Sequence, residues 1–261
     1  MVQAIILGVI QGLTEFLPIS STAHLVLVPE FLGWDDALLT SLPFDVALHA
    51  GTFLSVLICF RRDIVEMLTT DRRRLWLLAL ATVPAGVAGL TLEDYVSGVL
   101  RGPGVIGAML IAFGAVMLVS DRVGTRSRAL ASMGVRDALV IGLCQALALV
   151  PGVSRSGATI SARLFMGMRR EEAARFSFLL SLPVIAGAVL LEGRKLFTTA
   201  AAPGGSVDMA LVSAGFAASF VTGILAIRFM LRFLVDHRLD AFVVYRFVLG
   251  GFIFGWLMFG A

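Results

Sequence analysis

The chain has 261 residues, of which 58% are hydrophobic and only 15% are charged, and its mean hydropathy is +0.94. Soluble globular domains average about 45–50% apolar and about 25% charged residues. The composition therefore excludes an ordinary soluble domain and predicts an all-α polytopic membrane protein, with membrane lipids around it and no nucleic-acid partner.

The formal net charge of +3 comes from 20 arginines and a single lysine, so the position of the arginines carries most of the topological information. Cys59 and Cys144 lie in apolar runs without the spacing of a zinc or redox site, and we expect neither a disulfide nor a metal thiolate. Residues 1–17 lack a basic region and a small-residue cleavage site, so we expect no signal peptide.

The first apolar segment, 3–17, ends at Pro18, and a second short helical segment follows at 21–33. The first segment is roughly 22 Å long as a helix, which is short of the roughly 30 Å hydrocarbon core of a bilayer. Non-helical backbone at membrane depth is tolerated where it is buried in protein or lines a wet cavity. Two short helices around a polar break therefore predict a re-entrant hairpin that enters and leaves on one side.

Full-length spans are predicted at 43–60, 75–92, 103–120, 174–192, 208–231 and 242–260. Between the third and the fourth span, 137–150 and 156–168 repeat the pattern of two short helices, here around a Pro-Gly break. The sequence thus predicts six transmembrane helices plus two re-entrant helical hairpins in one integral-membrane domain, 1–261.

The positions of the arginines test this predicted topology. Sixteen basic residues fall in one set of connections, made of 61–74, 121–136, 169–175 and 228–246. The opposite set carries three, Arg101, Arg194 and Lys195. Because basic loops stay in the cytoplasm, the bias places both termini outside, with the first hairpin entering from outside and the second from the cytoplasm.

The two halves of the chain, about 1–121 and 136–261, look like repeats. Gly8 and Gln11 before Pro18 are echoed by Gly142 and Gln145 before Pro151. Because each half holds a re-entrant pair and three spans, an odd number of crossings, the copies are predicted to lie inverted. Inverted repeats with broken helices are also a transporter architecture.

Polar side chains gather between Gln11 and His24 in an otherwise apolar stretch, called here the first polar segment. Gln11 and Glu15 are four residues apart and project from one helix face. The Glu15 carboxylate is a candidate to hold a divalent cation, orient water or act as a base, and the amide of Gln11 offers a neutral oxygen ligand. Ser20 or Ser21 suits the N-cap of the next helix, with the imidazole one turn on, which makes a serine a candidate nucleophile. A routine cap and a structural histidine are the alternative interpretation.

The second polar segment, 151–159, lies in the other half. Ser154, Ser156 and Thr159 supply hydroxyl groups, and the N-terminus of the following helix adds partial positive charge suited to phosphate. Arg155 carries a planar guanidinium that matches phosphoryl oxygens, and no acidic residue lies within ten positions of it. Its counter-charge must come from a distant part of the fold or from a ligand. We expect the two polar segments to meet in one phosphate-handling site.

Two further polar groups are interpreted as structural. Arg163 is expected to pair with Glu171 or Glu172. Asp45 and His49 lie one turn apart at the start of a span, and a satisfied polar pair at a helix end is preferred over a supporting role in the site.

The segments QGLTEFLPISSTAHL and PGVSRSGAT resemble the two signature motifs of the undecaprenyl-diphosphatase family, the bacterial bacitracin-resistance membrane phosphatases. FDVALHAGT and FSFLLSLPVIAGA are also similar to that family's pattern, so the resemblance spans most of the chain. Gln11 is the neutral option at a position shared by Glu and Gln, and Ala23 stands where Gly is more usual.

The resemblance implies hydrolysis of undecaprenyl diphosphate to undecaprenyl phosphate and inorganic phosphate in the bacterial cytoplasmic membrane, which recycles the lipid carrier of cell-wall synthesis. It implies that Glu15 handles a metal or a proton, that Ser21 is the favoured nucleophile with His24 as acid–base partner, and that the second polar segment clamps the diphosphate. Gln11, Ser20, Ser154, Ser156 and Thr159 are the predicted substrate-binding residues, and a divalent cation, Mg²⁺ or Ca²⁺, is the implied cofactor.

Several alternatives stay open at this stage. Attack by Ser21, by His24 or by metal-bound water fits the same residues. The charge bias predicts an active site open to the periplasmic face. A lipid-phosphate flippase or ion-coupled transporter is the second functional hypothesis, because it would bind with the same side chains without cleaving. The small residues Gly215, Ser219 and Gly223 permit close helix packing within one chain or in a homodimer.

Overall fold

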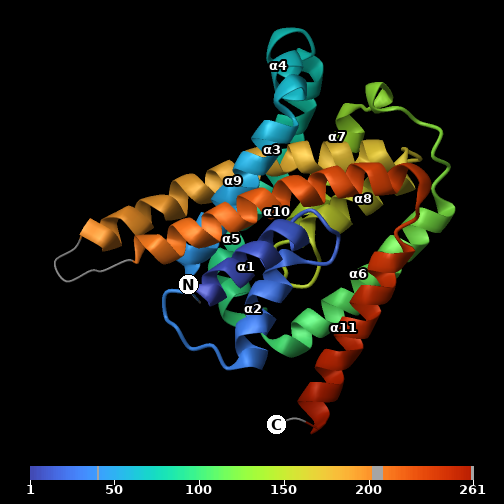
Figure 1. The fold of residues 1–261 in the computed structure, drawn as a ribbon. Helices are drawn as coiled ribbons and strands as arrows, with labels where there is room; N and C mark the ends of the chain where they lie inside the picture. Colours follow the sequence, from blue (N-terminus) through green and yellow to red (C-terminus); the bar gives the residue numbers. More distant parts are fainter. Residues whose placement is uncertain (40, 202–207, 260–261) are drawn as a thin grey trace.

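The computed structural model describes residues 1–39, 41–201 and 208–259, and helices make up most of this part of the chain (Figure 1). In order, they are α1 (Val2–Thr14), α2 (Ser21–Leu32), α3 (Leu42–Cys59), α4 (Arg61–Thr69), α5 (Arg72–Val99), α6 (Pro103–Val123), the short 3₁₀ turn η1 (Leu130–Ser132), α7 (Val135–Leu147), α8 (Arg155–Phe165), α9 (Arg170–Ala201), α10 (Met209–Asp236) and α11 (Asp240–Phe259).

Five described helices contain segments long and apolar enough to cross a membrane: 72–92 in α5, α6, 170–190 in α9, α10 and α11. Residues 44–59 and 61–69, in α3 and α4, are bent by 69° at their junction and count as a sixth span only if they are taken together. The prediction of an all-α, multi-pass membrane protein is confirmed. The exact count of six spans plus two re-entrant hairpins stays a prediction.

The four short helices α1, α2, α7 and α8 occur where the sequence predicts them, around breaks at 15–20 and 148–154. The long helices α5 and α9 extend beyond their predicted spans, because hydropathy marks only the apolar part of a helix. Backbone hydrogen bonding continues through the polar flanks. The short helices define the two turns that carry the polar segments.

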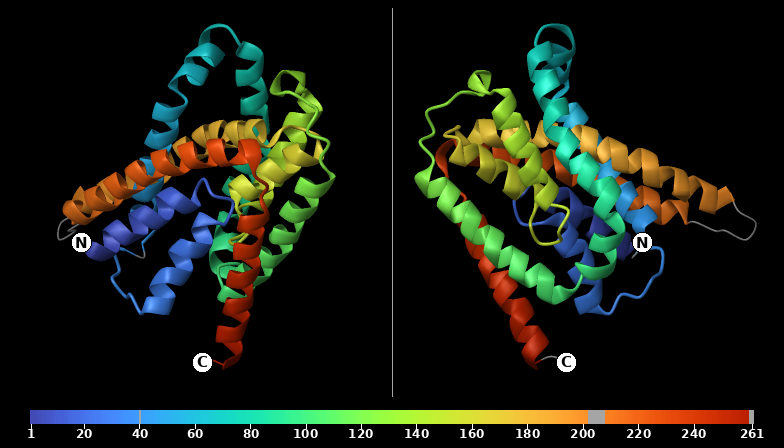
Figure 2. Two further views of the ribbon diagram at one scale, coloured as in Figure 1. Left: turned by 45° about the vertical axis from the view of Figure 1, so that its right-hand side comes forward. Right: turned by 180° about the vertical axis from the view of Figure 1, so that it is seen from behind.

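Each pair of short helices packs against long helices of the other half of the chain. α1 lies along α10, and α7 lies along α5. The long helices also pair across the halves, α6 with α11 and α3 with α9 (Figures 1 and 2). This packing of helices from opposite halves places the turn after α1 next to the turn after α7.

The packing of α1 and α3 on α10 depends on small residues. An added Cβ on Gly12 would lie 1.9 Å from Oγ1 of Thr222 and 2.6 Å from the carbonyl oxygen of Ser219. On Gly51 it would lie 2.0 Å from Oγ of Ser219. The stripe of small residues on α10 is therefore used for packing within the chain. This answers one of the two possibilities that the sequence left open.

Replacing Gly12 with valine should prevent folding, because the side chain would overlap the backbone of α10 where neither helix can retreat. We expect the Gly12→Val protein to be lost as a monodisperse species in size-exclusion chromatography in detergent. Gly89 has nothing within 4 Å of an added Cβ, so Gly89→Val is the matched control and should elute as wild type. Equal elution of both variants would contradict the packing argument.

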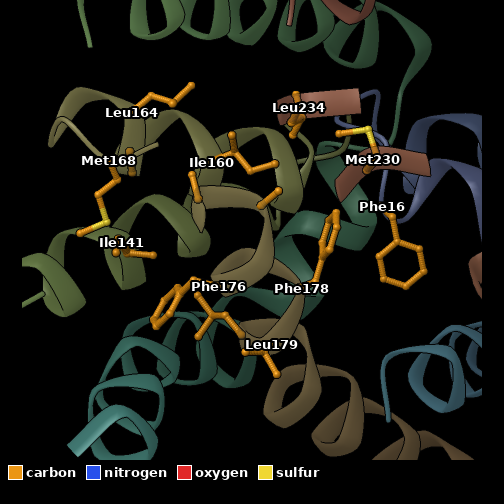
Figure 3. Close-up of a cluster of buried hydrophobic side chains, with 14 of the residues drawn as sticks. Phe16, Ile141, Ile160, Leu164, Met168, Phe176, Phe178, Leu179, Met230 and Leu234 are labelled. Atoms are coloured by element: carbon orange, nitrogen blue, oxygen red, sulfur yellow. The ribbon is translucent and has the colours of Figure 1, made fainter. Parts of the chain in front are cut away.

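The largest cluster of buried apolar side chains lies behind the two turns (Figure 3). Figure 3 shows Ile160 and Leu164 of α8, Phe176 and Phe178 of α9 and Ile141 of α7 as members of this cluster. Phe16, the residue after Glu15, packs edge-on against Phe178 with ring centroids 5.3 Å apart. The first turn and α8 therefore pack against the same set of buried side chains, those of α9.

The arginine-rich connections gather at one end of the structure, where ion pairs join them. Asp121, which is 1% exposed, accepts hydrogen bonds from Nε of Arg170 at 2.6 Å and from the backbone N–H of Leu239 at 2.9 Å. Asp63 accepts two from Arg175, at 2.9 and 2.7 Å. These contacts join α4 and α6 to α9, and α6 to the residue before α11. The side of the membrane on which they lie stays a prediction.

Arg163 has a structural role, with more partners than expected. Its guanidinium lies 4.2 Å from the ring centroid of Phe176 and donates to the sulfur of Met168. Glu171 and Glu172 form ion pairs with Arg169, and the negative charge of Glu172 also acts on the Arg163 guanidinium. Arg163 itself is fully buried in α8.

Candidate active site

Two serines give the turns the same backbone shape. Ser20 caps α2 with φ 75°, and Ser154 caps α8 with φ 72°, both in a region that residues with a side chain rarely adopt. Oγ of Ser20 accepts the backbone N–H of Ala23 at 3.4 Å and that of Gly152 at 3.2 Å. The first turn is thereby hydrogen-bonded directly to the second, as the sequence predicts.

Arg246 of α11 ties the two turns together from behind. Its guanidinium, 0% exposed, donates to five backbone carbonyl groups: those of Pro18 at 3.1 Å, Gly152 at 2.7 Å, Val153 at 3.2 Å, Met109 at 3.2 Å and Leu110 at 3.1 Å. Within the described part of the chain it pairs with no carboxylate. Arg246 is buried inside α11, so it does not belong with the basic residues of the connections. A charge inside a span was the signal that could have found it.

Glu15 is the centre of the site. Its Oε1 accepts a hydrogen bond from Nη2 of Arg155 at 2.7 Å, in an ion pair across the two polar segments. Its Oε2 accepts from Oγ of Ser21 at 2.8 Å and from Nε2 of Gln11 at 3.2 Å. Nε2 of His49 lies 3.7 Å from the same oxygen. The counter-charge that the sequence required for Arg155 is therefore Glu15, and the carboxylate is almost fully enclosed by donors.

Arg155 is held on its other side by α9. Its Nη1 donates to the backbone carbonyl of Ser177 at 2.7 Å. The hydroxyl groups of Ser177 and Thr159 lie 2.6 Å apart, and Thr159 also donates to the carbonyl of Arg155 at 2.8 Å. Ser177 was not predicted as a site residue, although it lies in the segment FSFLLSLP that carries part of the family resemblance.

Comparison with known families and proteins identifies the family of the chain. Residues 4–252 match the model of the family described as "Bacitracin resistance protein BacA". The chain belongs to the BacA family. It is 46% identical to the undecaprenyl-diphosphatase of Thermodesulfovibrio yellowstonii over 97% of this chain and 95% of that protein. It is 47% identical to the undecaprenyl-diphosphatase of Alcanivorax borkumensis over 98% of each chain. The BacA family is one of bacterial inner-membrane proteins linked to bacitracin resistance.

In this BacA-family protein, His24 does not bond to Ser21. Its Nδ1 lies 2.7 Å from the carbonyl oxygen of Ser20, which only accepts, so a neutral His24 carries its proton there. Nε2 then accepts from the hydroxyl group of Tyr245 at 2.6 Å. Both ring nitrogens are used, and the structure pairs Ser21 with Glu15 instead. The ring turns back along α2 toward the Ser20 carbonyl, so Ser21 and His24 are not hydrogen-bonded to each other, and the role of His24 as acid–base partner stays a prediction.

Replacing Tyr245 with phenylalanine should test this assignment of His24. The change leaves one ring nitrogen of a buried histidine without its donor, and a lost hydrogen bond of this kind costs about 1–3 kcal/mol of stability. We expect a lower thermal unfolding midpoint in detergent but a kcat for phosphate release within tenfold of wild type. A kcat that falls as far as in Ser21→Ala would instead place His24 in the proton transfer. The His24→Gln variant, measured under the same conditions, removes the imidazole itself. Comparing its kcat with that of Tyr245→Phe separates the effect of the ring from the effect of the lost hydroxyl group.

The structure corrects the interpretation of His49 as part of a self-contained polar pair. Its Nδ1 bonds to the backbone carbonyl of Asp45 at 2.7 Å, as a satisfied pair would, but its Nε2 faces Glu15. The sequence offered no sign of this, because His49 reaches Glu15 only through the packing of α3 against α1. The His49 side chain is 28% exposed and that of Arg155 14%, so these two groups and Ser21 form the accessible edge of the site.

The hydroxyl groups of the second polar segment are engaged with the protein itself. Ser154 accepts the backbone N–H of Gly157 at 3.2 Å and lies 3.1 Å from Oγ of Ser156. Ser156 donates to the carbonyl of Leu17 at 3.3 Å. With Thr159 fully buried as well, these side chains build the walls of the site, and their predicted contact with substrate stays a prediction.

A metal site made of protein groups alone is not present in the described residues, where no three His, Cys, Asp or Glu side chains are placed to hold an ion. Mg²⁺ in phosphate-processing sites is commonly held by one or two carboxylates plus the phosphates of the substrate. Oε1 of Gln11 is buried without a hydrogen-bond partner in the described part of the chain, on the side chain that donates to Glu15. In this arrangement Gln11 turns its Nε2 donor toward Glu15, so its free Oε1 and the carboxylate do not face one common point, and a divalent cation held by Gln11 and Glu15 stays a prediction.

Proposed function

We propose that this protein hydrolyses undecaprenyl diphosphate to undecaprenyl phosphate and inorganic phosphate, and so recycles the lipid carrier of cell-wall synthesis in the bacterial inner membrane. The observation that carries the proposal is the ion pair between Arg155 and Glu15, with Ser21 on the same carboxylate. It joins a phosphate-binding group, a proton acceptor and a hydroxyl group at the junction of the two polar segments. The relatives named undecaprenyl-diphosphatase support the choice of substrate.

Arg155 is the proposed ligand of the terminal phosphate. Phosphoryl transfer needs positioning and charge neutralisation more than elaborate covalent chemistry. Without substrate, Glu15 balances the partly buried guanidinium. The diphosphate carries more negative charge than one carboxylate, so it replaces Glu15 on Nη2 while Nη1 stays anchored to the carbonyl of Ser177. Substrate binding thereby frees Glu15 for proton transfer.

Ser21 is the proposed nucleophile, and Glu15 is its base. The hydroxyl group already donates to Oε2 of Glu15 at 2.8 Å, so the proton has an acceptor when the oxygen attacks the terminal phosphorus. As the new bond to the Ser21 oxygen forms, the bond from that phosphorus to the bridging oxygen breaks, and undecaprenyl phosphate leaves with the proton from Glu15. The regenerated carboxylate then deprotonates a water molecule that attacks the phosphorylated serine. The bond between phosphorus and the Ser21 oxygen breaks, the proton passes to that oxygen, and inorganic phosphate leaves. Gln11 and Glu15 would hold Mg²⁺ or Ca²⁺, which neutralises phosphate charge when bound.

The proposed topology is six spans and two re-entrant hairpins in inverted repeats, with both termini and the active-site opening on the periplasmic face. Three observations support it. The two turns share the positive-φ serine cap. The short helices α1 and α7 pack on corresponding long helices of opposite halves. Ion pairs join the arginine-rich connections to one another, and connections rich in arginine suit the cytoplasmic side.

The test is phosphate release from undecaprenyl diphosphate by the purified protein in detergent, with Mg²⁺, with Ca²⁺ and with excess chelator. We expect release that needs the cation and that falls at least about 10²-fold in Ser21→Ala, because the attacking oxygen is lost. Release that persists in chelator would remove the metal from the proposal without removing Ser21. Wild-type protein that binds the lipid but releases no phosphate would overturn the hydrolase and favour the transporter.

A further inference from the structure

The second half of α10 carries a groove of about 560 Å³, remote from the chemistry above. It is lined by Leu225, Arg228, Phe229, Arg232, Phe233 and His237. In the described part of the chain, none of these side chains hydrogen-bonds to either polar segment. The groove therefore needs an explanation of its own.

One side of the groove is a ladder of aromatic rings, of which Phe233 is partly buried against the core. The rings of Phe229 and Phe233 stack with centroids 5.3 Å apart, and those of Phe233 and His237 with centroids 4.5 Å apart. Phe229 is 50% exposed, and Leu225 one turn before it is 57% exposed. An apolar strip of this kind on a membrane-spanning helix is suited to a hydrocarbon chain.

The other side is basic. Arg228 and Arg232 are both exposed and lie one turn apart on α10, where like charges repel. Neither has an ion pair or a side-chain hydrogen bond within the described residues. By contrast, Arg170 and Arg175 at the same end of the molecule each bond to a buried aspartate. Arg228 and Arg232 thus have no anionic partner of the kind that the aspartates provide for Arg170 and Arg175.

We propose that this groove binds an anionic phospholipid. The phosphate lies between Arg228 and Arg232, and an acyl chain follows the aromatic ladder toward Leu225. A net negative headgroup matches the two unpaired guanidinium groups, whereas a zwitterionic headgroup brings its own ammonium. Basic pockets at the cytoplasmic ends of transmembrane helices are suited to such lipids. The site is independent of the proposed hydrolysis, because it shares no residue with it.

The experiment measures the thermal unfolding midpoint of the purified protein in detergent with added phosphatidylglycerol, phosphatidylcholine or inorganic phosphate. A ligand that binds only the folded state raises the midpoint. We expect phosphatidylglycerol to raise it by several degrees in the wild type and the other two additives to raise it much less. The double variant Arg228→Gln, Arg232→Gln should lose that increment while keeping its own midpoint and its phosphatase activity in phosphatidylcholine.

The matched control is the double variant Arg72→Gln, Arg136→Gln. It removes the same charge from two exposed arginines outside the groove, and it should keep the full response to phosphatidylglycerol. Three results would overturn the proposal: an equal shift with phosphatidylcholine, an unchanged shift in the groove variant, or a shift reproduced by inorganic phosphate alone. Equal loss in both double variants would also overturn it, by showing a response to net charge only.

Discussion

Arg155→Ala should lower kcat/KM for phosphate release by about 10³-fold or more, the scale on which arginines act in phosphoryl transfer. The side chain is the one guanidinium at the accessible edge of the described site, and it also pairs with Glu15 at 2.7 Å. Its loss removes the ligand of the terminal phosphate and leaves a buried carboxylate without its counter-charge. The measurement is steady-state phosphate release with saturating divalent cation.

Arg155→Lys separates these two consequences. Lysine keeps a positive charge beside Glu15 but cannot bond to Glu15 and to the Ser177 carbonyl with one planar group. We expect a folded protein by size-exclusion chromatography whose kcat/KM is still reduced by about 10²-fold, because positioning is lost. A lysine variant with wild-type kinetics would show that Arg155 supplies charge only. An alanine variant that is folded and fully active would remove Arg155 from the site.

Arg246→Lys should lower kcat by about 10²-fold while changing KM much less. Arg246 touches no group of the accessible edge; it holds the carbonyl groups of Pro18 and Gly152, one in each turn. Lysine has three donors for the five carbonyl groups that the guanidinium serves, so the two turns lose their common support. A shift of about 1 Å between reacting groups can cost about 10²-fold in rate. Arg246 is therefore a positioning residue.

Arg246→Met gives the stronger form of the same change, because five buried carbonyl groups lose their donor and the folded yield should fall as well. Arg238→Met is the control, since Arg238 is exposed in the connection before α11 and should leave both yield and kcat unchanged. The split between kcat and KM is the informative readout. A proportional rise of KM at constant kcat in Arg246→Lys would assign Arg246 to substrate binding instead. Wild-type kinetics in both variants would refute its positioning role.

The strained serine caps explain why two separate supports are needed. Ser20 and Ser154 hold positive φ angles that cost of order 1–3 kcal/mol each. The structure over-determines both turns through the Ser20–Gly152 hydrogen bond and through Arg246. The same contacts hold the turns before α2 and α8 together.

The class of the protein and the places of its short helices were predictable from local properties. The end of an apolar run at Pro18, or at the Pro151–Gly152 break, predicts the end of a helix. Arginines outside the apolar runs predict the connections. The two polar segments were equally visible, because polar groups inside apolar sequence are costly. The bend between α3 and α4 was not, because it depends on the contacts of α4 with α5.

The sequence by itself determined that this is a helical membrane protein with Glu15, Ser21 and Arg155 in two polar turns, because composition and spacing are local properties of the chain. Only the tertiary structure decided which partners these side chains have. Arg155 bonds to Glu15, which lies 140 positions away in the sequence, and His24 bonds to Tyr245, which lies 221 positions away. Those contacts follow from the packing of α1 on α10, α7 on α5 and α11 on α6, where close-packed surfaces select one register. The spacing of residues within either polar segment does not predict these contacts.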